Sequence, residues 1–226
     1  MQNVKKINTK KLTVMGMLCA LAFICVLLFR FEVGGFLTFD VKDAVLTVAS
    51  LIYGPFAGLI CSLVVTFLEF ILISDTGVYG FIMNFLSSAA LSVVAGGIYK
   101  YRRSMFGAVM GVIFAVISCT AVMLLANLFI TPLYFKEMGR EAVINMIVPL
   151  LLPFNVIKAV FNGSLVLIIY KPFTSALRKA KLLIADGKSS YKFGFKSVLL
   201  LVVVIIVLVG ALLFLFLKMD GNIDLF

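Results

Sequence analysis

Three polar side chains, Asn155, Lys158 and Asn162, interrupt an apolar segment of the 226-residue chain. Their spacing of i, i+3 and i+7 places all three on one face of a helix. Pro153 lies just ahead of them and favours the first turn of a helix. Two amides and an ammonium group on one face can bind a polar small molecule. The alternative is that Lys158 extends to the membrane surface, or pairs with Glu69 to lock the helices together.

Three more polar residues, Glu69, Asn84 and Asn127, lie alone in other apolar segments. Polar groups in hydrocarbon are costly, and they usually face a protein interior or a wet cavity. An intramembrane Asn more often bonds to a neighbouring helix than to a ligand, so both roles stay open. If all six polar residues lie at one depth, they form a cup open to one face of the membrane and not a pore.

The composition identifies the class of protein. Hydrophobic residues make up 63% of the chain and charged residues 13%, against roughly 45–50% and 25% in soluble domains. Apolar stretches of 18 residues or more are long enough for helices to cross a membrane. We therefore predict an all-α integral membrane protein.

Several activities are excluded by what the sequence lacks. Without His there is no Ser-His-Asp set and no His-ligated metal, and no Walker lysine loop is present for ATP hydrolysis. We expect neither an enzyme nor a cofactor. Internal repeats, typical of stand-alone secondary transporters, are not evident, so a transport function would require a partner.

We expect seven helices, the second of which is too short to span a membrane at about 1.5 Å per residue. The segment 31–43 must therefore dip into the membrane to meet it. The helices are predicted at 12–30, 43–53, 55–74, 81–99, 105–130, 153–178 and 196–217. Residues 1–180 then form a six-helix substrate-binding core, 181–195 a basic cytoplasmic linker, and 196–226 an additional C-terminal transmembrane helix with a short outer tail.

The basic residues predict the orientation. Fourteen of the 20 Lys and Arg lie in the N-terminus, in 100–103 and in 171–196, and five lie on the opposite side, Lys42 among them. The positive-inside rule places the fourteen in the cytoplasm. The chain is then a multi-pass plasma-membrane protein with its N-terminus inside and its C-terminus outside, and the net charge of +10 needs no nucleic acid. The polar cup opens outward.

Two further segments have open interpretations. The stretch 32–40 combines two glycines, aromatic residues and a carboxylate, and is either a lid over a flat ligand or a re-entrant connector with Phe36 and Phe39 as interface anchors. Gly16 and Ala20 form a small-xxx-small pair beside Ala22. Such a pair either lets a partner helix approach closely or serves packing within the bundle.

The order and spacing of several motifs resemble one family, the riboflavin-specific substrate-binding (S) components of energy-coupling-factor (ECF) vitamin transporters. The resemblance covers residues 12–178. The motifs are Phe36-Leu37-Thr38-Phe39-Asp40, Tyr53-Gly54-Pro55-Phe56-Ala57-Gly58, Thr76-Gly77-Val78-Tyr79-Gly80, Met83-Asn84-Phe85, Thr131-Pro132-Leu133-Tyr134 and Leu152-Pro153-Phe154-Asn155-Val156-Ile157-Lys158.

The resemblance implies a six-helix S-component core that captures riboflavin from outside and toppling of this subunit during transport. A transmembrane coupling subunit and two cytoplasmic ATPases would be the partners. It implies that Asn127, Asn155 and Lys158 bind the flavin, with Leu37, Thr38, Asp40 and Asn84 completing the pocket. The family's helix 1 docks the coupling subunit through Ala-xxx-Ala, for which this chain has Gly16 and Ala20. The seventh helix exceeds the family core.

The leading hypothesis is a riboflavin-binding subunit of an ATP-driven importer. The alternatives are an S component for another vitamin, and a membrane scaffold or small channel without a vitamin ligand. A channel requires polar residues along its whole length, whereas the inner half of this chain offers mainly small and apolar residues.

Overall fold

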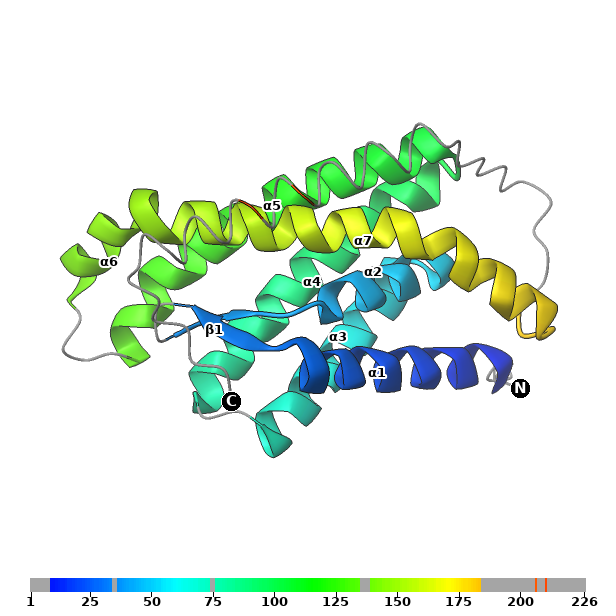
Figure 1. Cartoon of the computed structure of the whole chain (residues 1–226), viewed down its shortest axis with the longest axis horizontal. Helices are drawn as coiled ribbons and strands as arrows, with labels where there is room; N and C mark the ends of the chain where they lie inside the picture. The colour runs from blue at the N-terminus through cyan, green and yellow to red at the C-terminus, as the bar shows by residue number, and fades with distance from the viewer. Residues whose placement is uncertain are drawn as a thin grey trace, which may run out of the picture.

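The computed structural model describes residues 9–33, 36–73, 76–134 and 139–183, together with 206 and 210. Within these residues, five helical stretches are long and apolar enough to cross a membrane, and they run side by side in Figure 1. The helices are α1 (Thr9–Phe29), α2 (Lys42–Tyr53), α3 (Pro55–Leu72), α4 (Gly77–Tyr101), α5 (Met105–Tyr134), α6 (Arg140–Met146) and α7 (Leu152–Lys179). The predicted helix at 196–217 lies outside the described residues, apart from 206 and 210.

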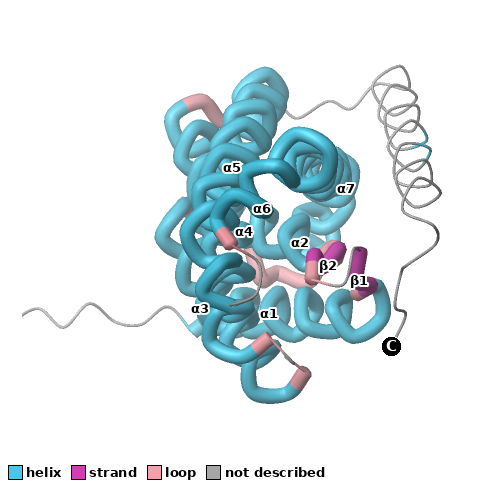
Figure 2. The backbone as a smooth tube through the Cα atoms, turned by 90° about the vertical axis from the view of Figure 1, so that its left-hand side faces the viewer, coloured by secondary structure: helices cyan, strands magenta, loops and turns pink. Residues whose placement is uncertain are grey.

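The short helix α2 lies in the middle of the bundle, where it contacts α1, α3, α4 and α7, as Figure 2 shows along the helix axes. Residues 42–51 are all buried. The helix ends at Gly54, whose φ of +93° lies in the left-handed region that glycine tolerates, and Pro55 starts α3. The short helix is therefore enclosed by the longer helices of the bundle.

The segment between α1 and α2 corrects the all-α prediction. It forms a hairpin in which β1 (Phe31–Val33) pairs antiparallel with β2 (Leu37–Phe39). Phe39 is buried, stacks on Phe31 at 4.9 Å between ring centroids and packs against α7. The hairpin is thus fixed to the bundle by its apolar side, and Phe39 is a core residue and not an interface anchor.

Helix α7 is continuous with the helical residues that precede it. A π-helical turn, η1 (Ile147–Leu151), joins α6 to α7, so the helical stretch runs from Arg140 to Lys179. Pro149 and Pro153 each lack the N–H that a regular helix needs. The π turn accommodates the two prolines without ending the helix. A start at Pro153 was expected from the sequence because Pro favours the first turn of a helix.

Helix α1 has two different faces. Val14, Leu18 and Ala22, spaced four residues apart, are fully buried against the bundle. Gly16 and Ala20 lie on the opposite face and are exposed, and a Cβ added at Gly16 would meet nothing within 4 Å. Among the described residues, the pair therefore does not pack against another helix of the bundle, in contrast to Ala22.

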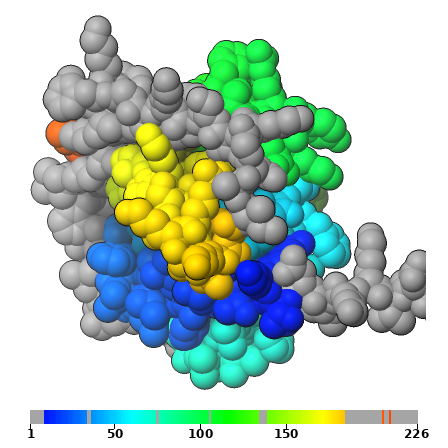
Figure 3. All heavy atoms as spheres, turned by 90° about the vertical axis from the view of Figure 1, so that its right-hand side faces the viewer, coloured from blue at the N-terminus to red at the C-terminus, as the bar shows by residue number. Residues whose placement is uncertain are grey.

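The described parts of the predicted basic segments lie together at one end of the molecule. Figure 3 views this end, where α1 begins, α4 turns into α5, and α7 finishes. The Lys10 ammonium group donates a hydrogen bond to the carbonyl of Lys181 at 3.4 Å, which links the two outermost helices there. The hairpin lies toward the opposite end (Figure 1).

Candidate binding site

A cavity opens at the hairpin end of the bundle, between the hairpin and helices α4, α5 and α7. The empty space between these elements is about 680 Å³, a figure that includes open solvent at the mouth. Its lining residues are Phe36, Leu37, Thr38, Thr76, Tyr79, Gly80, Met83, Asn84, Ser87, Met123, Asn127, Ile130, Thr131, Phe154, Asn155 and Lys158. The cavity therefore combines an apolar wall with a few polar groups.

Lys158 reaches the cavity from α7. Its ammonium nitrogen donates hydrogen bonds to the Thr38 carbonyl at 2.8 Å and to Asp40 Oδ2 at 2.9 Å. An ammonium group has three N–H donors. Among the described residues only these two acceptors are met, so one donor remains for a ligand. The alternative of a Lys158–Glu69 pair is wrong, because Glu69 pairs elsewhere.

Two amides in the cavity wall have their NH2 groups tied to backbone carbonyls. Asn155 Nδ2 donates to the Leu151 carbonyl at 2.7 Å, and Asn127 Nδ2 donates to the Met123 carbonyl at 2.8 Å. A carbonyl accepts and cannot donate, so these contacts fix the orientation of each amide. Asn127 Oδ1 accepts a bond from Thr131 at 3.0 Å. No described residue donates to Asn155 Oδ1, which is left as an acceptor.

Asn84 is oriented in the same way, but by a carboxylate. Its Nδ2 donates to Glu69 Oε1 at 3.0 Å, between α4 and α3. Glu69 is 1% exposed, and its second oxygen lies 3.1 Å from the Lys42 ammonium nitrogen. In the described part of the chain no group donates to Asn84 Oδ1. All three amides thus direct their NH2 groups into the protein.

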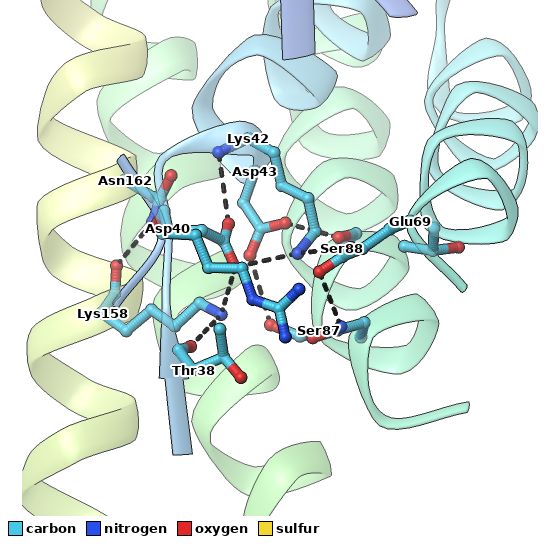
Figure 4. Close-up of polar contacts among 12 residues, drawn as sticks. Thr38, Asp40, Lys42, Asp43, Glu69, Ser87, Ser88, Lys158 and Asn162 are labelled. Atoms are coloured by element: carbon cyan, nitrogen blue, oxygen red, sulfur yellow. Dashed lines mark hydrogen bonds and ion pairs between the residues drawn. The ribbon is translucent and has the colours of Figure 1, made fainter. Parts of the chain in front are cut away.

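A cluster of buried charges lies beneath the cavity, where the hairpin meets α2 (Figure 4). Asp40 Oδ2 is 2.8 Å from the Lys42 ammonium nitrogen and 2.9 Å from that of Lys158. Asp43 accepts hydrogen bonds from Ser87, at 3.2 Å, and from Ser88. Buried charges are tolerated when they are paired and hydrogen-bonded. Asp40, Lys42 and Lys158 each have an oppositely charged partner, and Asp43 has two hydroxyl donors.

Asn162 lies below Lys158 on α7 and connects this helix to the start of α2. Its Oδ1 accepts the Ala44 N–H at 2.9 Å, and its Nδ2 donates to the carbonyls of Asp40 and Lys158 at 2.9 and 3.1 Å. The first N–H groups of a helix lack partners within the helix, so Asn162 satisfies one of them for α2. It is fully buried and its role is structural.

Most of the residues predicted to bind the ligand meet at this cavity. Leu37, Thr38, Asn84, Asn127, Asn155 and Lys158 line it. Asp40 does not line the cavity, because its side chain is fully buried. It accepts a hydrogen bond from Lys158, which does line the cavity. Lys42, which the orientation count placed on the outer side, is 1% exposed inside the bundle.

Several lining residues were not singled out from the sequence as ligand contacts. Tyr79 and Thr131 belong to motifs that were noted, whereas Met83, Met123 and Phe154 are apolar residues among many. Apolar residues in a membrane protein carry no sequence signal that separates a cavity wall from a lipid-facing surface. Only the three-dimensional arrangement assigns them to the site.

Comparison with known proteins places this fold and cavity in a family. Residues 10–170 match the family model described as "ECF transporter, substrate-specific component". The riboflavin transporter RibU of Staphylococcus aureus (strain TCH60) is 30% identical over 77% of this chain and 97% of its own length. The riboflavin transporter FmnP of Bacillus subtilis (strain 168) is 29% identical over 76% of this chain and 98% of its own.

A solved structure of the S component of a bacterial ECF transporter resembles the fold with a TM-score of 0.63 and 30% identity. The match covers 76% of this chain and 99% of that chain. Like these relatives, the chain is a component of a transporter and not an enzyme, and it lies in the membrane through several helices. The chain therefore belongs to the family of substrate-specific components of ECF transporters.

Proposed function

We propose that this chain captures riboflavin from the extracellular side, as the substrate-binding subunit of an ATP-driven importer. The observation that carries the proposal is the polarity of the cavity. Asn84 and Asn155 leave carbonyl oxygens as acceptors, and Lys158 leaves one ammonium donor. The imide edge of a flavin ring presents a carbonyl, an N–H and a second carbonyl in a row. The ammonium donor can bind one of these carbonyls and one amide oxygen can accept the imide N–H, while the other amide oxygen can accept from a hydroxyl group of the ribityl chain.

The apolar wall of the cavity suits the faces of a flat ring. Leu37, Met83, Met123 and Phe154 lie around the polar groups. Most of the surface of a small ligand is buried when it binds, and an aromatic ring is stabilised by apolar and aromatic contacts on its faces. The two relatives described above are both named riboflavin transporters, which supports the same ligand here.

The orientation and the partners complete the proposal. The basic ends of α1 and α7 face the cytoplasm, because basic segments are retained there. The cavity at the hairpin end then opens outward, with the N-terminus inside and the C-terminus outside. A transmembrane coupling subunit docks on the exposed small residues Gly16 and Ala20, and two cytoplasmic ATPases supply the energy.

A competition assay tests the ligand. Quenching of riboflavin fluorescence by the detergent-purified protein is measured first. Displacement of radiolabelled riboflavin from the protein by unlabelled riboflavin, thiamine, biotin and folate is measured second. We expect quenching, and displacement of the label only by riboflavin and close flavins. Displacement by another vitamin would favour an S component for that vitamin. Unquenched fluorescence would contradict riboflavin binding.

Uptake in cells tests the partner requirement. Deletion of the ATPase subunits should abolish accumulation of radiolabelled riboflavin, while membranes from the same cells should still bind it. Accumulation that persists without the ATPases would show that the chain transports riboflavin on its own.

A further inference from the structure

We infer that Glu69 and Lys42 are positioning residues for the ligand, although neither lines the cavity. They fix which end of the Asn84 amide is presented to the bound molecule, and Lys42 shares Asp40 with Lys158. This inference rests on the proposed function, since it concerns the polarity that the cavity offers to riboflavin. It assigns a binding role to two buried charges that would otherwise serve only to hold the helices together.

The contacts form an unbroken chain beneath the cavity, from one wall to the other. Asn84 on α4 donates to Glu69 on α3 at 3.0 Å, and Glu69 lies 3.1 Å from the Lys42 ammonium at the start of α2. Lys42 lies 2.8 Å from Asp40, which lies 2.9 Å from the Lys158 ammonium on α7. Only the two ends of this chain, Asn84 and Lys158, line the cavity.

Glu69 decides the orientation of the Asn84 amide. The two ends of an amide side chain have the same shape, so its hydrogen-bond partners alone determine which end faces the ligand. The Glu69 carboxylate oxygen accepts the bond, so Glu69 binds the NH2 end of the amide. Asn84 Oδ1 is left as the ligand's acceptor. The backbone carbonyls beside Asn155 and Asn127 produce the same orientation, so the polarity is shared by all three amides.

Lys42 holds Glu69 in place through the 3.1 Å contact between its ammonium nitrogen and Glu69 Oε2. Glu69 is 1% exposed, and an uncompensated carboxylate at such a position is strongly disfavoured. One ammonium group serves both Glu69 and Asp40, and an ammonium has no acceptor. Glu69 faces Lys42 with Oε2 and therefore has Oε1 left to accept from Asn84. Asp40 contacts both Lys42 and Lys158 through the same oxygen, Oδ2.

The substitution Glu69→Gln reverses this arrangement while preserving the shape of the side chain. The Lys42 ammonium can only donate, so it retains the glutamine oxygen. The glutamine NH2 group then faces Asn84 and requires its Oδ1 as the partner. Asn84 must turn over and present its NH2 group to the cavity, where the ligand's N–H now meets a donor instead of an acceptor.

A double-mutant cycle on riboflavin affinity tests the inference, with Kd measured by fluorescence quenching of the purified full chain. We expect E69Q to raise Kd about 10-fold or more, because a favourable hydrogen bond is replaced by two opposed donors. In the N84A background, the same substitution should change Kd by less than about 2-fold, since no amide remains to be turned. A residue with only a structural role would act equally in both backgrounds.

Equal effects of E69Q with and without Asn84 would overturn the inference, as would an unchanged Kd in E69Q. The matched control is E141Q, which removes the same charge at an exposed position on α6 and should leave Kd unaltered. If the unsubstituted protein does not bind riboflavin at all, the proposed function fails and not this inference alone.

A second variant covers the case in which E69Q does not fold. The pair K42M/E69L removes one positive and one negative charge together and leaves Asp40 paired with Lys158, so no buried charge is orphaned. Asn84 is then free to turn, and we expect a rise in Kd of about 2- to 5-fold that disappears in the N84A background. A Kd equal to that of the unsubstituted protein would contradict the inference.

Discussion

Replacement of Lys158 by Met is the perturbation whose outcome follows most directly from the geometry. Met fills a similar volume but cannot donate. The ligand loses one hydrogen bond from a charged donor, typically worth about 1.5–3 kcal/mol. The Kd for riboflavin should therefore rise roughly 10- to 150-fold.

The same structure predicts that K158M still folds. Loss of one partner from a buried ion pair typically costs about 3–5 kcal/mol, because the other charge is orphaned. Here Asp40 retains Lys42 at 2.8 Å, so we expect a cost at or below the lower end of that range. Thermal unfolding of the detergent-purified protein measures this cost.

The matched control is K171M, which removes a Lys from an exposed position farther along the same helix. It should change neither Kd nor unfolding. A K158M protein that folds and binds riboflavin as tightly as the unsubstituted chain would refute the role of Lys158 in binding, and would return this residue to holding the hairpin against α7.

Three further substitutions separate binding, folding and assembly. N155A removes an acceptor from the cavity and should raise the Kd for riboflavin about 5-fold. The control N145A, at an exposed position on α6, should leave Kd unchanged. Equal riboflavin titration curves for N155A and N145A would contradict this prediction. N162L removes the hydrogen bonds that join α7 to the start of α2 and should lower the free energy of unfolding by about 3 kcal/mol. An unchanged melting temperature would show that these hydrogen bonds are dispensable. G16L or A20L should preserve riboflavin binding but abolish uptake in cells, because a bulky side chain keeps a partner helix at a distance; normal uptake would move the docking surface elsewhere.

The long helices were predictable because each is specified locally. Runs of apolar residues mark α1, α3, α4, α5 and α7, and the predicted bounds for α3 and α7 differ from the observed ones by at most two residues. Four of the polar cavity residues were equally predictable. An Asn or Lys inside an apolar run is conspicuous, so the sequence alone pointed to Asn84, Asn127, Asn155 and Lys158.

The hairpin was missed although its sequence carries the signal. Val33, Leu37 and Phe39 are apolar residues on either side of the pair Gly34-Gly35, a pattern typical of a β-hairpin. Strands of three residues are too short to stand out in a prediction based on long apolar segments. For the same reason the segment was expected to be a lid or a re-entrant connector, with no strand in it.

The pairing of buried charges could not be predicted. Lys42 and Glu69 are far apart in sequence, on different helices, and no periodicity connects them. Local composition favours an exposed position for Lys42, since it follows a loop and has an aspartate on each side within two residues. Only the packing of α2 among four other helices buries it, and that packing is a property of the whole bundle.

The most direct measurement of the central claim is calorimetric titration of riboflavin into the ligand-free, detergent-purified full chain. The cavity geometry predicts saturable binding of one flavin per chain that is weakened in K158M and unaltered in K171M. Heats no larger than those of dilution, from protein that is folded by thermal unfolding, would contradict a flavin site built from these amides and this ammonium group.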